Sequence, residues 1–414
     1  MAEHAFQWPQ PSGPHSVGFA QFSVADPSRA ALHAPEPTPE RDLLVLAWYP
    51  AADTAGRARR HYMEPRDLDG GHASLNLFQI APAEQAHLAH LETAAYSDAP
   101  VAPGRFPLIV FCHGIFGFPQ QNSVLMEHLA SSGYIVVSVA HPFESGTHFL
   151  PDGRRLLMDP GMWPEVAHLG AIPQNLDAYF GADLATRRAG MTHMLHAMRS
   201  MCVGRLPQVW ADDLVFVADR IAQGAVPAAA TAIAAASDID RLAYLGMSFG
   251  GHVAALCCLK DPRARAGANL DGGVFSAEPF GRELGLPFLA LTGDLSVGAA
   301  AVGRTAPAPS PASQTLLDFA YNRPDGVPPA WPLHRLGVPG TTHVDFADFP
   351  LLFDPSHVPV LASSMPPGRW YALKVRIVGE FFDHYLRGLH PAFPAPLAAD
   401  YPDLLVIHDA RPAS

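Results

Sequence analysis

The chain has 414 residues, of which 49% are apolar and 16% charged, so it is long enough for one large domain or two ordinary ones. Its 39 acidic and 27 basic side chains leave a net charge of −12. This balance builds no dense positive field of the kind that phosphate backbones attract, so we expect no nucleic-acid partner. Only two of the 27 basic residues are lysine, and 42 residues are proline. This residue usage is typical of a GC-rich bacterial genome and does not indicate a disordered chain.

The cysteines and the N-terminus indicate a cellular compartment. Four cysteines occur without C-x-x-C spacing, at positions Cys112, Cys202, Cys257 and Cys258. This pattern favours free thiols in a reducing compartment over a disulfide framework or a zinc site. The first residues lack the basic and apolar regions of a signal peptide, and no run of 18 apolar residues occurs. We therefore expect a cytoplasmic protein with no transmembrane segment and no metal site.

Apolar runs alternate with helical patterns along most of the chain. Runs of apolar or β-branched residues predict strands at residues 17–24, 43–49, 107–113, 134–140, 242–246, 266–270 and 286–292. Helical patterns lie at residues 120–132, 249–259 and 371–386, whereas residues 51–100 show no clear order. Several of the runs are apolar throughout, which is typical of strands buried on both faces. The pattern predicts an α/β fold with a mostly parallel sheet and helices on both faces.

About 100 residues separate the predicted strands at 134–140 and 242–246, which is more than one crossover helix needs. We therefore expect a single domain over residues 1–414 with a helical insertion or cap at residues 142–240. Within it, apolar residues recur at helical spacing at Met191, Met194, Leu195, Met198 and Cys202. Such a methionine stripe favours core packing over ligand contact. Residues 297–332, rich in Ala, Pro and Ser, predict a loop excursion within the domain.

The segment Gly246-Met-Ser-Phe-Gly250 stands where a predicted buried strand meets a predicted helix. Its glycines remove Cβ atoms that would clash in a sharp turn, and such a turn raises the Ser248 hydroxyl at the helix N-terminus. The Gly-x-Ser-x-Gly motif alone is a weak signal, but the apolar strand before it and the small residues after it are typical of a nucleophile elbow. The alternative is an ordinary turn with a capping serine. We predict that Ser248 is a nucleophile.

A serine nucleophile needs a histidine base and a carboxylate that orients it. After an elbow of this kind the chain order is serine, acid, histidine. Six histidines follow the last predicted strand, at His334, His343, His357, His384, His390 and His408. We predict His343 as the base, because it lies in a loop before the last helix. Asp271 and Asp294 both follow predicted strands, and the residues alone favour Asp294, at the commoner position.

Acyl transfer also needs two backbone N–H donors for the developing oxyanion. Phe249, the residue after the nucleophile, supplies the first. The second is expected from the loop after the strand at 107–113, where Gly114 lets the backbone turn toward the serine. We predict the N–H of Ile115, with Phe116 as the alternative. His113 precedes this loop, and we expect it to brace the loop by hydrogen bonds and not to act as a catalytic or metal-binding residue.

An ordered set of segments resembles the platelet-activating factor acetylhydrolase family, which comprises the plasma and type II enzymes and their bacterial relatives within the α/β-hydrolases. The similar segments are residues 17–19, 26–29, 47–50, 106–114, 129–137, 140–142, 248–251, 269–271 and 343–349. The resemblance implies an α/β-hydrolase fold. It also implies that the acid follows the strand after the nucleophile helix, which is Asp271 and not Asp294. The chain departs from the family at Met247, where histidine is usual, and at Gly272 and Gly273, where mammalian members carry bulkier residues.

The resemblance implies a serine carboxylic-ester hydrolase that needs no metal or organic cofactor. Its small-molecule substrates would be short-acyl or oxidised-acyl esters, including sn-2 phospholipid-type esters. Phe116, Phe118 and the methionine helix are candidates for an apolar wall, although core packing is the stronger expectation for each. The alternatives are a general short-chain carboxylesterase, a polyester hydrolase, an acyltransferase and a non-catalytic binding protein of the same fold. The natural substrate, the oligomeric state and any transient contact with a lipid surface stay open.

Overall fold

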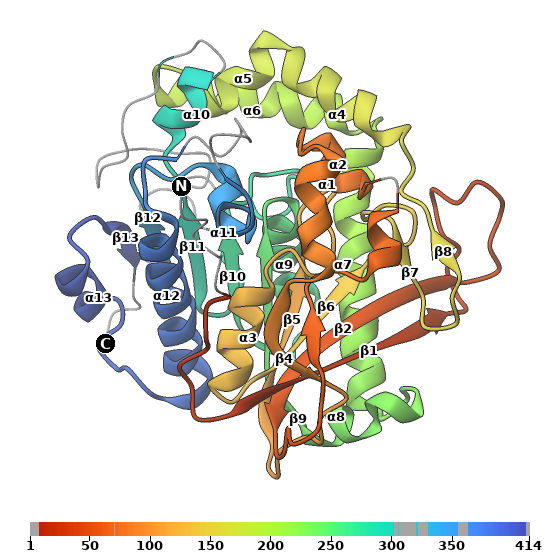
Figure 1. The fold of residues 1–414 in the computed structure, drawn as a ribbon. Helices are drawn as coiled ribbons and strands as arrows, with labels where there is room; N and C mark the ends of the chain where they lie inside the picture. The colour runs from red at the N-terminus through yellow and green to blue at the C-terminus, as the bar shows by residue number, and fades with distance from the viewer. Residues whose placement is uncertain are drawn as a thin grey trace, which may run out of the picture.

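The computed structural model describes residues 8–69, 71–301, 305, 320–321, 330–354 and 363–410. In these ranges the strands form one large sheet with the order β13-β12-β11-β10-β9-β5-β6-β2-β1-β4-β3 (Figure 1). The strands are β1 (Ser16–Asp26), β2 (Arg41–Ala51), β3 (Arg59–His61), β4 (Glu92–Ser97), β5 (Phe106–Cys112), β6 (Ile135–Ala140), β9 (Ser237–Met247), β10 (Ala264–Leu270), β11 (Phe288–Thr292), β12 (Leu333–Gly337) and β13 (Leu405–Ala410). A separate hairpin pairs β7 (His148–Phe149) with β8 (Arg155–Leu156).

The middle of the sheet is parallel. The strands β6, β5, β9, β10, β11 and β12 run in the same direction. The strands β2 and β13 pair antiparallel with the two outer members of this group. Parallel strands carry their carboxyl ends to one edge of the sheet, where open α/β sheets bind ligands. The predicted α/β class with a mostly parallel sheet is confirmed.

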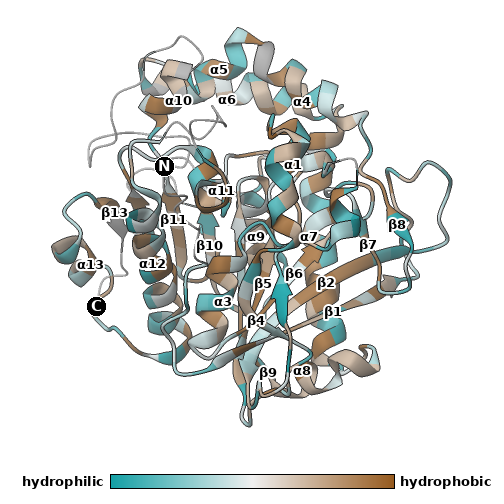
Figure 2. Cartoon of the chain, in the orientation of Figure 1, coloured by the Kyte–Doolittle hydropathy of each residue, from teal (hydrophilic) through white to brown (hydrophobic). Residues whose placement is uncertain are grey.

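Helices cover both faces of the sheet, and the strand residues divide between them. Leu108 and Val110 of β5 lie in a core cluster with α7 (Cys202–Ala222) and α9 (Phe249–Lys260). Ile109 and Phe111 lie in a second cluster with α3 (Ser123–Ser131) and α12 (Pro367–Arg387). Successive side chains of a strand point to opposite faces, so a strand between two helical layers must be apolar throughout. Figure 2 shows these central strands in brown between helices of mixed colour.

The segment between β6 and β9 is mainly helical. Its helices are α4 (Met162–Ala171), α5 (Pro173–Phe180), α6 (Leu184–Met198), α7, η3 (Ala228–Ala230) and α8 (Thr231–Ala236). Figure 1 shows α4, α5 and α6 above the sheet, at the end where β9 runs into α9. Met191, Met194 and Met198 of α6 are buried in one core cluster with Cys202, the first residue of α7, whereas Leu195 is partly buried. Core packing is as predicted, but the predicted stripe crosses the break between two helices. The division of the chain into a domain and an insertion at 142–240 stays a prediction.

Several elements were not predicted from the sequence. Residues 51–100 contain β3 and β4 and the short helices η1 (Pro65–Leu68), α1 (Ala73–Leu77), α2 (Pro82–Gln85) and η2 (Ala86–Ala89). The strands β12 and β13, and the helices α10 (Leu295–Ala301), η5 (His343–Phe346), α11 (Phe349–Leu352) and α13 (Ala395–Asp400), complete the described elements. Most of the loop excursion predicted at 297–332 lies outside the described residues. None of the helices in the described ranges combines the length and apolarity that crossing a bilayer requires.

Candidate active site

Ser248 stands between the end of β9 and the start of α9, in a sharply bent backbone with φ of 60° and ψ of −127°. A positive φ at a residue other than glycine costs about 1–3 kcal/mol and persists only where the surroundings enforce it. The surroundings here are tight. A Cβ at Gly246 would lie 1.9 Å from the Gly250 carbonyl oxygen, and one at Gly250 would lie 2.1 Å from the Cys112 carbonyl oxygen. The absence of a Cβ at both glycines therefore lets neighbouring backbone segments approach closely, as the elbow pattern predicts.

The structure brings Ser248, His343 and Asp271 together. His343 Nε2 lies 2.8 Å from Ser248 Oγ, and His343 Nδ1 lies 2.7 Å from Asp271 Oδ2. An Nδ1–H that donates to the carboxylate leaves Nε2 as an acceptor for the serine hydroxyl. The His343 side chain is 50% exposed and that of Asp271 is 18% exposed. The arrangement can therefore take a proton from the serine at a site that solvent reaches.

Asp271 is itself held by backbone contacts. Its φ is 52°, and its N–H donates to the Leu291 carbonyl at 2.7 Å. Its Oδ1 accepts a hydrogen bond from the Gly293 N–H at 2.8 Å, which leaves Oδ2 for the histidine. The strained backbone and the two hydrogen bonds fix the direction of the carboxylate toward His343.

Asp294, the alternative acid, contacts a different part of the same loop. Its Oδ2 accepts a hydrogen bond from the Gly340 N–H at 2.9 Å, and its own N–H donates to the Thr341 carbonyl at 3.0 Å. No hydrogen bond joins Asp294 to His343 within the described residues. Among the other candidate bases, His334 is buried in β12 and His384 lies on α12, whereas His357 is outside the described residues.

The turn that carries His343 rests on a buried lysine that sequence reasoning did not single out. Lys374 of α12 is 1% exposed, and its Nζ donates to the carbonyls of Phe346 and Ala347 at 3.2 Å each. Burial lowers the pKa of Lys374 and raises that of the nearby Asp348 carboxyl, and attraction between the two groups opposes both shifts. Lys374 could have been singled out from the sequence, because lysine is rarely found on the apolar face of an amphipathic helix.

The loop after β5 approaches the serine closely. A Cβ at Gly114 would lie 3.2 Å from the Ser248 Cβ. The loop turns back on itself, because the Gly117 N–H donates to the Gly114 carbonyl at 2.9 Å and Phe116 has a φ of 58°. In the described part of the chain, the N–H of Ile115 donates to no protein acceptor. The loop can therefore offer an N–H at the serine, and Ile115 stays the predicted donor, with Phe116 as the alternative.

His113 braces this loop, as the sequence predicts. Its Nδ1–H donates to the Gly114 carbonyl at 2.7 Å, and its Nε2 lies 2.8 Å from Ser145 Oγ. Burial lowers the pKa of His113 well below 6.5, so the ring is neutral and carries a single N–H. A neutral imidazole with both nitrogens engaged is a structural support and offers nothing to a substrate.

Two helices of the 142–240 segment reach the site. Trp163 of α4 packs edge-on against Phe116, with ring centroids 5.4 Å apart. The Tyr179 hydroxyl of α5 lies 2.9 Å from the position that a Cβ on Gly273 would take. Burial and the charge of Asp271 raise the pKa of Tyr179 to about 12, so its hydroxyl keeps its proton. Phe118, a second wall candidate, is instead 1% exposed and packs in a separate core cluster.

A second group of three linked side chains, with a cysteine in the place of the serine, lies inside the protein. Cys112 Sγ is 3.6 Å from His141 Nε2, and His141 Nδ1 is 2.7 Å from Asp213 Oδ2. All three side chains are 0% exposed, and burial raises the pKa of the Cys112 thiol well above 9. A protonated thiol without solvent access cannot attack a substrate. In the described residues, no group of three or more His, Cys, Asp or Glu side chains is arranged to hold a metal ion.

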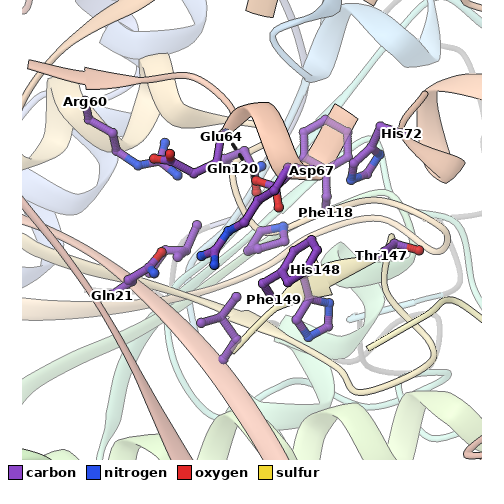
Figure 3. A pocket seen from close by; sticks show the side chains of 14 residues that line it. Gln21, Arg60, Glu64, Asp67, His72, Phe118, Gln120, Thr147, His148 and Phe149 are labelled. Atoms are coloured by element: carbon purple, nitrogen blue, oxygen red, sulfur yellow. Dashed lines mark hydrogen bonds between the residues drawn. The ribbon is translucent and has the colours of Figure 1, made fainter. Parts of the chain in front are cut away.

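A small pocket lined by both polar and apolar side chains lies on another side of the loop after β5 (Figure 3). Arg60, Asp67, His72 and His148 line it together with Phe118. Burial lowers the pKa of each histidine to about 4, so both imidazoles are neutral. The residues that line this pocket do not include Ser248, His343 or Asp271, so the pocket is separate from the candidate active site.

The chain is similar to several known proteins. The family model for platelet-activating factor acetylhydrolase, isoform II, matches residues 1–154. The platelet-activating factor acetylhydrolase of Gallus gallus is 26% identical over 149 residues, 35% of this chain and 33% of that protein. The enzyme of the same name from Canis lupus familiaris is 27% identical over 183 residues, 43% of this chain and 38% of that protein. The chain therefore spans about a third of the length of these curated relatives.

Two further matches cover nearly the whole chain. A protein of Arthroderma benhamiae named "Probable 1-alkyl-2-acetylglycerophosphocholine esterase" is 21% identical over 436 residues, 97% of this chain and 94% of that protein. The solved structure of a ferulic acid esterase from Streptomyces cinnamoneus superposes with a TM-score of 0.67 at 23% identity, over 98% of this chain and 100% of that one. The sheet order and the elbow, with this superposition, define the α/β-hydrolase fold. Over residues 1–154 the chain is similar to the platelet-activating factor acetylhydrolase family, in line with the resemblance seen in the sequence.

Proposed function

We propose that the protein is a serine carboxylic-ester hydrolase that works through Ser248, His343 and Asp271. The observation that carries the proposal is the continuous hydrogen-bonded path of 2.8 Å and 2.7 Å from the serine oxygen through the imidazole to the carboxylate. Nucleophile, base and orienting acid in this geometry are the requirement for attack by an otherwise unreactive hydroxyl. The names of the relatives, acetylhydrolase and esterase, support the same reaction class.

The reaction proceeds in two halves. Ser248 attacks the ester carbonyl while His343 takes the hydroxyl proton, and Asp271 stabilises the imidazolium that forms. The N–H groups of Phe249 and Ile115 stabilise the negative oxygen of the tetrahedral intermediate. Collapse of the intermediate breaks the bond to the alcohol, which leaves with the proton from His343. Water then attacks the acyl-enzyme with His343 again as base, which releases the acid and restores the serine. Besides the ester and water, these steps use only groups of this chain.

The substrates that we propose are short-acyl or oxidised-acyl esters, including sn-2 phospholipid-type esters. Two names support this class, because the matching family model is described as an acetylhydrolase and the Arthroderma benhamiae protein is named a probable 1-alkyl-2-acetylglycerophosphocholine esterase. Trp163 packs against Phe116 in the loop after β5, and Tyr179 lies next to Gly273, two residues after Asp271. We propose that the helices of residues 142–240 act as a cap that forms an apolar wall of the site. The four unpaired cysteines support a reducing, cytoplasmic location.

A general short-chain carboxylesterase is the second candidate function. The observation in its favour is the half-exposed side chain of His343, because an open site accepts alcohols of many shapes. The same exposure disfavours an acyltransferase, which must keep water from the acyl-enzyme. A polyester hydrolase and a non-catalytic binding protein are the remaining alternatives, and the binding protein would have no need of the path from Ser248 to Asp271.

The test is hydrolysis of p-nitrophenyl esters from acetate to palmitate by the full chain, with Ser248→Ala as the blank. Labelling by a fluorophosphonate is measured in parallel. We expect labelling of the wild type only, and turnover that is highest for the acetate and short esters. A fluorophosphonate signal that persists in Ser248→Ala would contradict the nucleophile. Turnover that rises with chain length would contradict the short-acyl preference, and labelling without turnover would favour an acyltransferase.

A further inference from the structure

A buried hydrogen-bond network connects the helix α7 to the loop after β5. Its side chains come from β2, from the residues after β5 and β6, and from α7. We call it the α7 network, and its members are Arg41, His113, His141, Glu144, Ser145, Trp210 and Asp213. Each of these side chains is 0% exposed. Seven polar or aromatic groups without solvent access must satisfy one another, and the structure shows how they do so.

The charged part of the network is balanced and fully paired. The Arg41 guanidinium donates to Asp213 through Nε at 2.8 Å and to Glu144 through Nη2 at 2.7 Å. Arg29, at the edge of the network, adds a second cation 2.8 Å from Asp213. Burial would raise the pKa of the Asp213 carboxyl, but Arg41 and His141 outweigh it and hold this pKa well below its usual value. Buried ion pairs of this kind add little stability over apolar residues of the same volume, so stability alone does not explain the network.

The network ends on the peptide bond that carries the predicted oxyanion donor. Asp213 Oδ2 accepts from His141 Nδ1–H at 2.7 Å, and the His141 backbone N–H donates to Ser145 Oγ at 2.6 Å. The Ser145 hydroxyl donates to His113 Nε2 at 2.8 Å. His113 in turn donates from Nδ1 to the Gly114 carbonyl at 2.7 Å. A carbonyl oxygen can only accept, so the neutral ring must carry its proton on Nδ1 and the order of donors is determined.

Holding the Gly114 carbonyl also holds the next N–H. The C=O of Gly114 and the N–H of Ile115 belong to one planar trans peptide, in which the two groups point in opposite directions. The carbonyl is held from one side by His113 and by the Gly117 N–H at 2.9 Å. The N–H of Ile115 is therefore fixed in direction although no protein acceptor binds it within the described residues. A free but oriented N–H is what oxyanion stabilisation requires.

The same network contacts the second predicted donor. The Trp210 indole stacks on His141 at 3.9 Å, and its Nε1–H donates to Glu144 Oε2 at 2.7 Å. The ring also meets His113 and Phe249 edge-on, with centroid distances of 5.1 Å and 4.9 Å. Phe249 directly follows the serine. One indole on α7 therefore contacts His113, two residues before the donor Ile115, and the side chain of the second donor, Phe249.

We propose that the α7 network positions the N–H groups of Ile115 and Phe249 for oxyanion stabilisation. The inference rests on the proposed function and deepens it, because it gives α7, which lies within residues 142–240, a part in the transition state. It makes Ser145 and Trp210 positioning residues, which act through His113 and Phe249 without touching substrate. Removing a positioning group should lower kcat and leave KM nearly unchanged, because the oxyanion exists only after substrate has bound.

The first test compares Ser145→Ala with Ser237→Ala. Ser237 is a buried serine at the start of β9, and its hydroxyl donates to the Ile233 carbonyl at 2.9 Å, far along the strand from the site. Loss of a whole oxyanion donor lowers kcat by about 10²–10³. We expect Ser145→Ala to lower kcat for p-nitrophenyl acetate by about tenfold to a hundredfold, with KM within about twofold. A trifluoromethyl ketone, whose adduct carries the oxyanion, should bind more weakly by the same factor as the fall in kcat/KM. Ser237→Ala should change neither quantity.

The second test compares Trp210→Phe with Trp48→Phe, in case the first variant fails to fold. Trp48 of β2 is also fully buried, but its indole N–H has no hydrogen-bond partner in the described structure and it lies in the other core cluster. Trp210→Phe should lower kcat by about threefold to thirtyfold and Trp48→Phe should leave it within about twofold, although both should lower the unfolding temperature. Equal losses of kcat in both, or a change in KM alone, would overturn the inference.

Different results would contradict the proposed function and the role of the α7 network. A wild type that neither hydrolyses the esters nor reacts with the fluorophosphonate would overturn the proposed function and this inference with it. A wild type that hydrolyses them, together with folded Ser145→Ala and Trp210→Phe variants of unchanged kcat, would overturn only the inference.

Discussion

The carboxylate of Asp294 binds the backbone N–H of Gly340 at 2.9 Å, three residues before His343. Asp294 therefore supports the loop of the proposed base, whereas Asp271 contacts the imidazole itself. We expect Asp271→Asn to lower kcat by about 10³–10⁴, because the amide favours the wrong tautomer of the histidine. Asp294→Asn keeps an acceptor oxygen for Gly340 and should lower kcat by less than about tenfold. Steady-state hydrolysis of p-nitrophenyl acetate measures both, and the reverse order would show that Asp294 is the acid.

Gly273 and Tyr179 provide a test of the wall that α5 contributes. An added methyl on Gly273 would lie 2.9 Å from the Tyr179 hydroxyl, which is too close for an undisturbed contact. We expect Gly273→Ala to lower kcat/KM by about threefold to tenfold by displacing the tyrosine ring. The double variant with Tyr179→Phe should recover most of this loss, because contacting residues couple by about 0.5–3 kcal/mol. Additive effects in this double-mutant cycle would show that the two residues do not touch.

The two lysines of the chain offer a matched pair for stability. Lys374 is buried and holds two carbonyls of the His343 turn, whereas Lys260 is 33% exposed and pairs with Asp212 at 2.6 Å. Lys374→Met leaves those carbonyls and the buried Asp348 without their cation and should lower the free energy of unfolding by about 3–5 kcal/mol. Lys260→Met should lower it by no more than about 1 kcal/mol. Urea unfolding of both variants checks the contrast, and equal losses would contradict the role of Lys374.

Stability should fall in mild acid because of buried neutral histidines. Burial lowers the pKa of His72, His148 and His252 to about 4 each, below the ordinary value of 6.5. The unfolded chain then binds these protons more tightly than the folded chain. The contribution of each group is fully present above pH 6.5 and is lost as the pH falls toward 4, with a full effect of about 3 kcal/mol for one histidine.

This pH dependence is measured by urea unfolding between pH 7.5 and pH 4.5. His252→Gln should reduce the slope of unfolding free energy against pH by up to about one proton. Val253→Ala, a change at the neighbouring buried position, should lower stability by a similar amount at every pH and leave the slope unchanged. A slope that is the same in His252→Gln and the wild type would mean that this histidine titrates alike in both states.

The central strands were predictable because their environment is uniform along their length. β5, β6, β10 and β11 lie between two helical layers, so both sets of alternating side chains are apolar and the run is visible without an alignment. β12 was not predicted from the sequence, because His334 and Arg335 interrupt its short apolar run, although both are buried. The small elements of residues 51–100 are too short to show a period.

Some residues of the candidate site were also predictable from the sequence, and others were not. The serine was visible from local chemistry, because a strand, a glycine-flanked serine and a helix follow one another directly in the chain. The acid was not, because Asp271 and Asp294 follow neighbouring parallel strands whose carboxyl ends reach the same edge of the sheet. The residues alone favoured Asp294, the family resemblance favoured Asp271, and the structure brings Asp271 to His343.

The sequence by itself determined the α/β class, the elbow at Ser248 and the loop that His113 braces. Each of these depends on neighbours within a few residues, and such neighbours are set by backbone sterics and side-chain periodicity. The tertiary structure decided which aspartate meets His343 and joined Arg41, Ser145 and Asp213 in one network. Those contacts join residues up to 172 positions apart. They depend on the order of strands in the sheet, and no local pattern of residues carries that order.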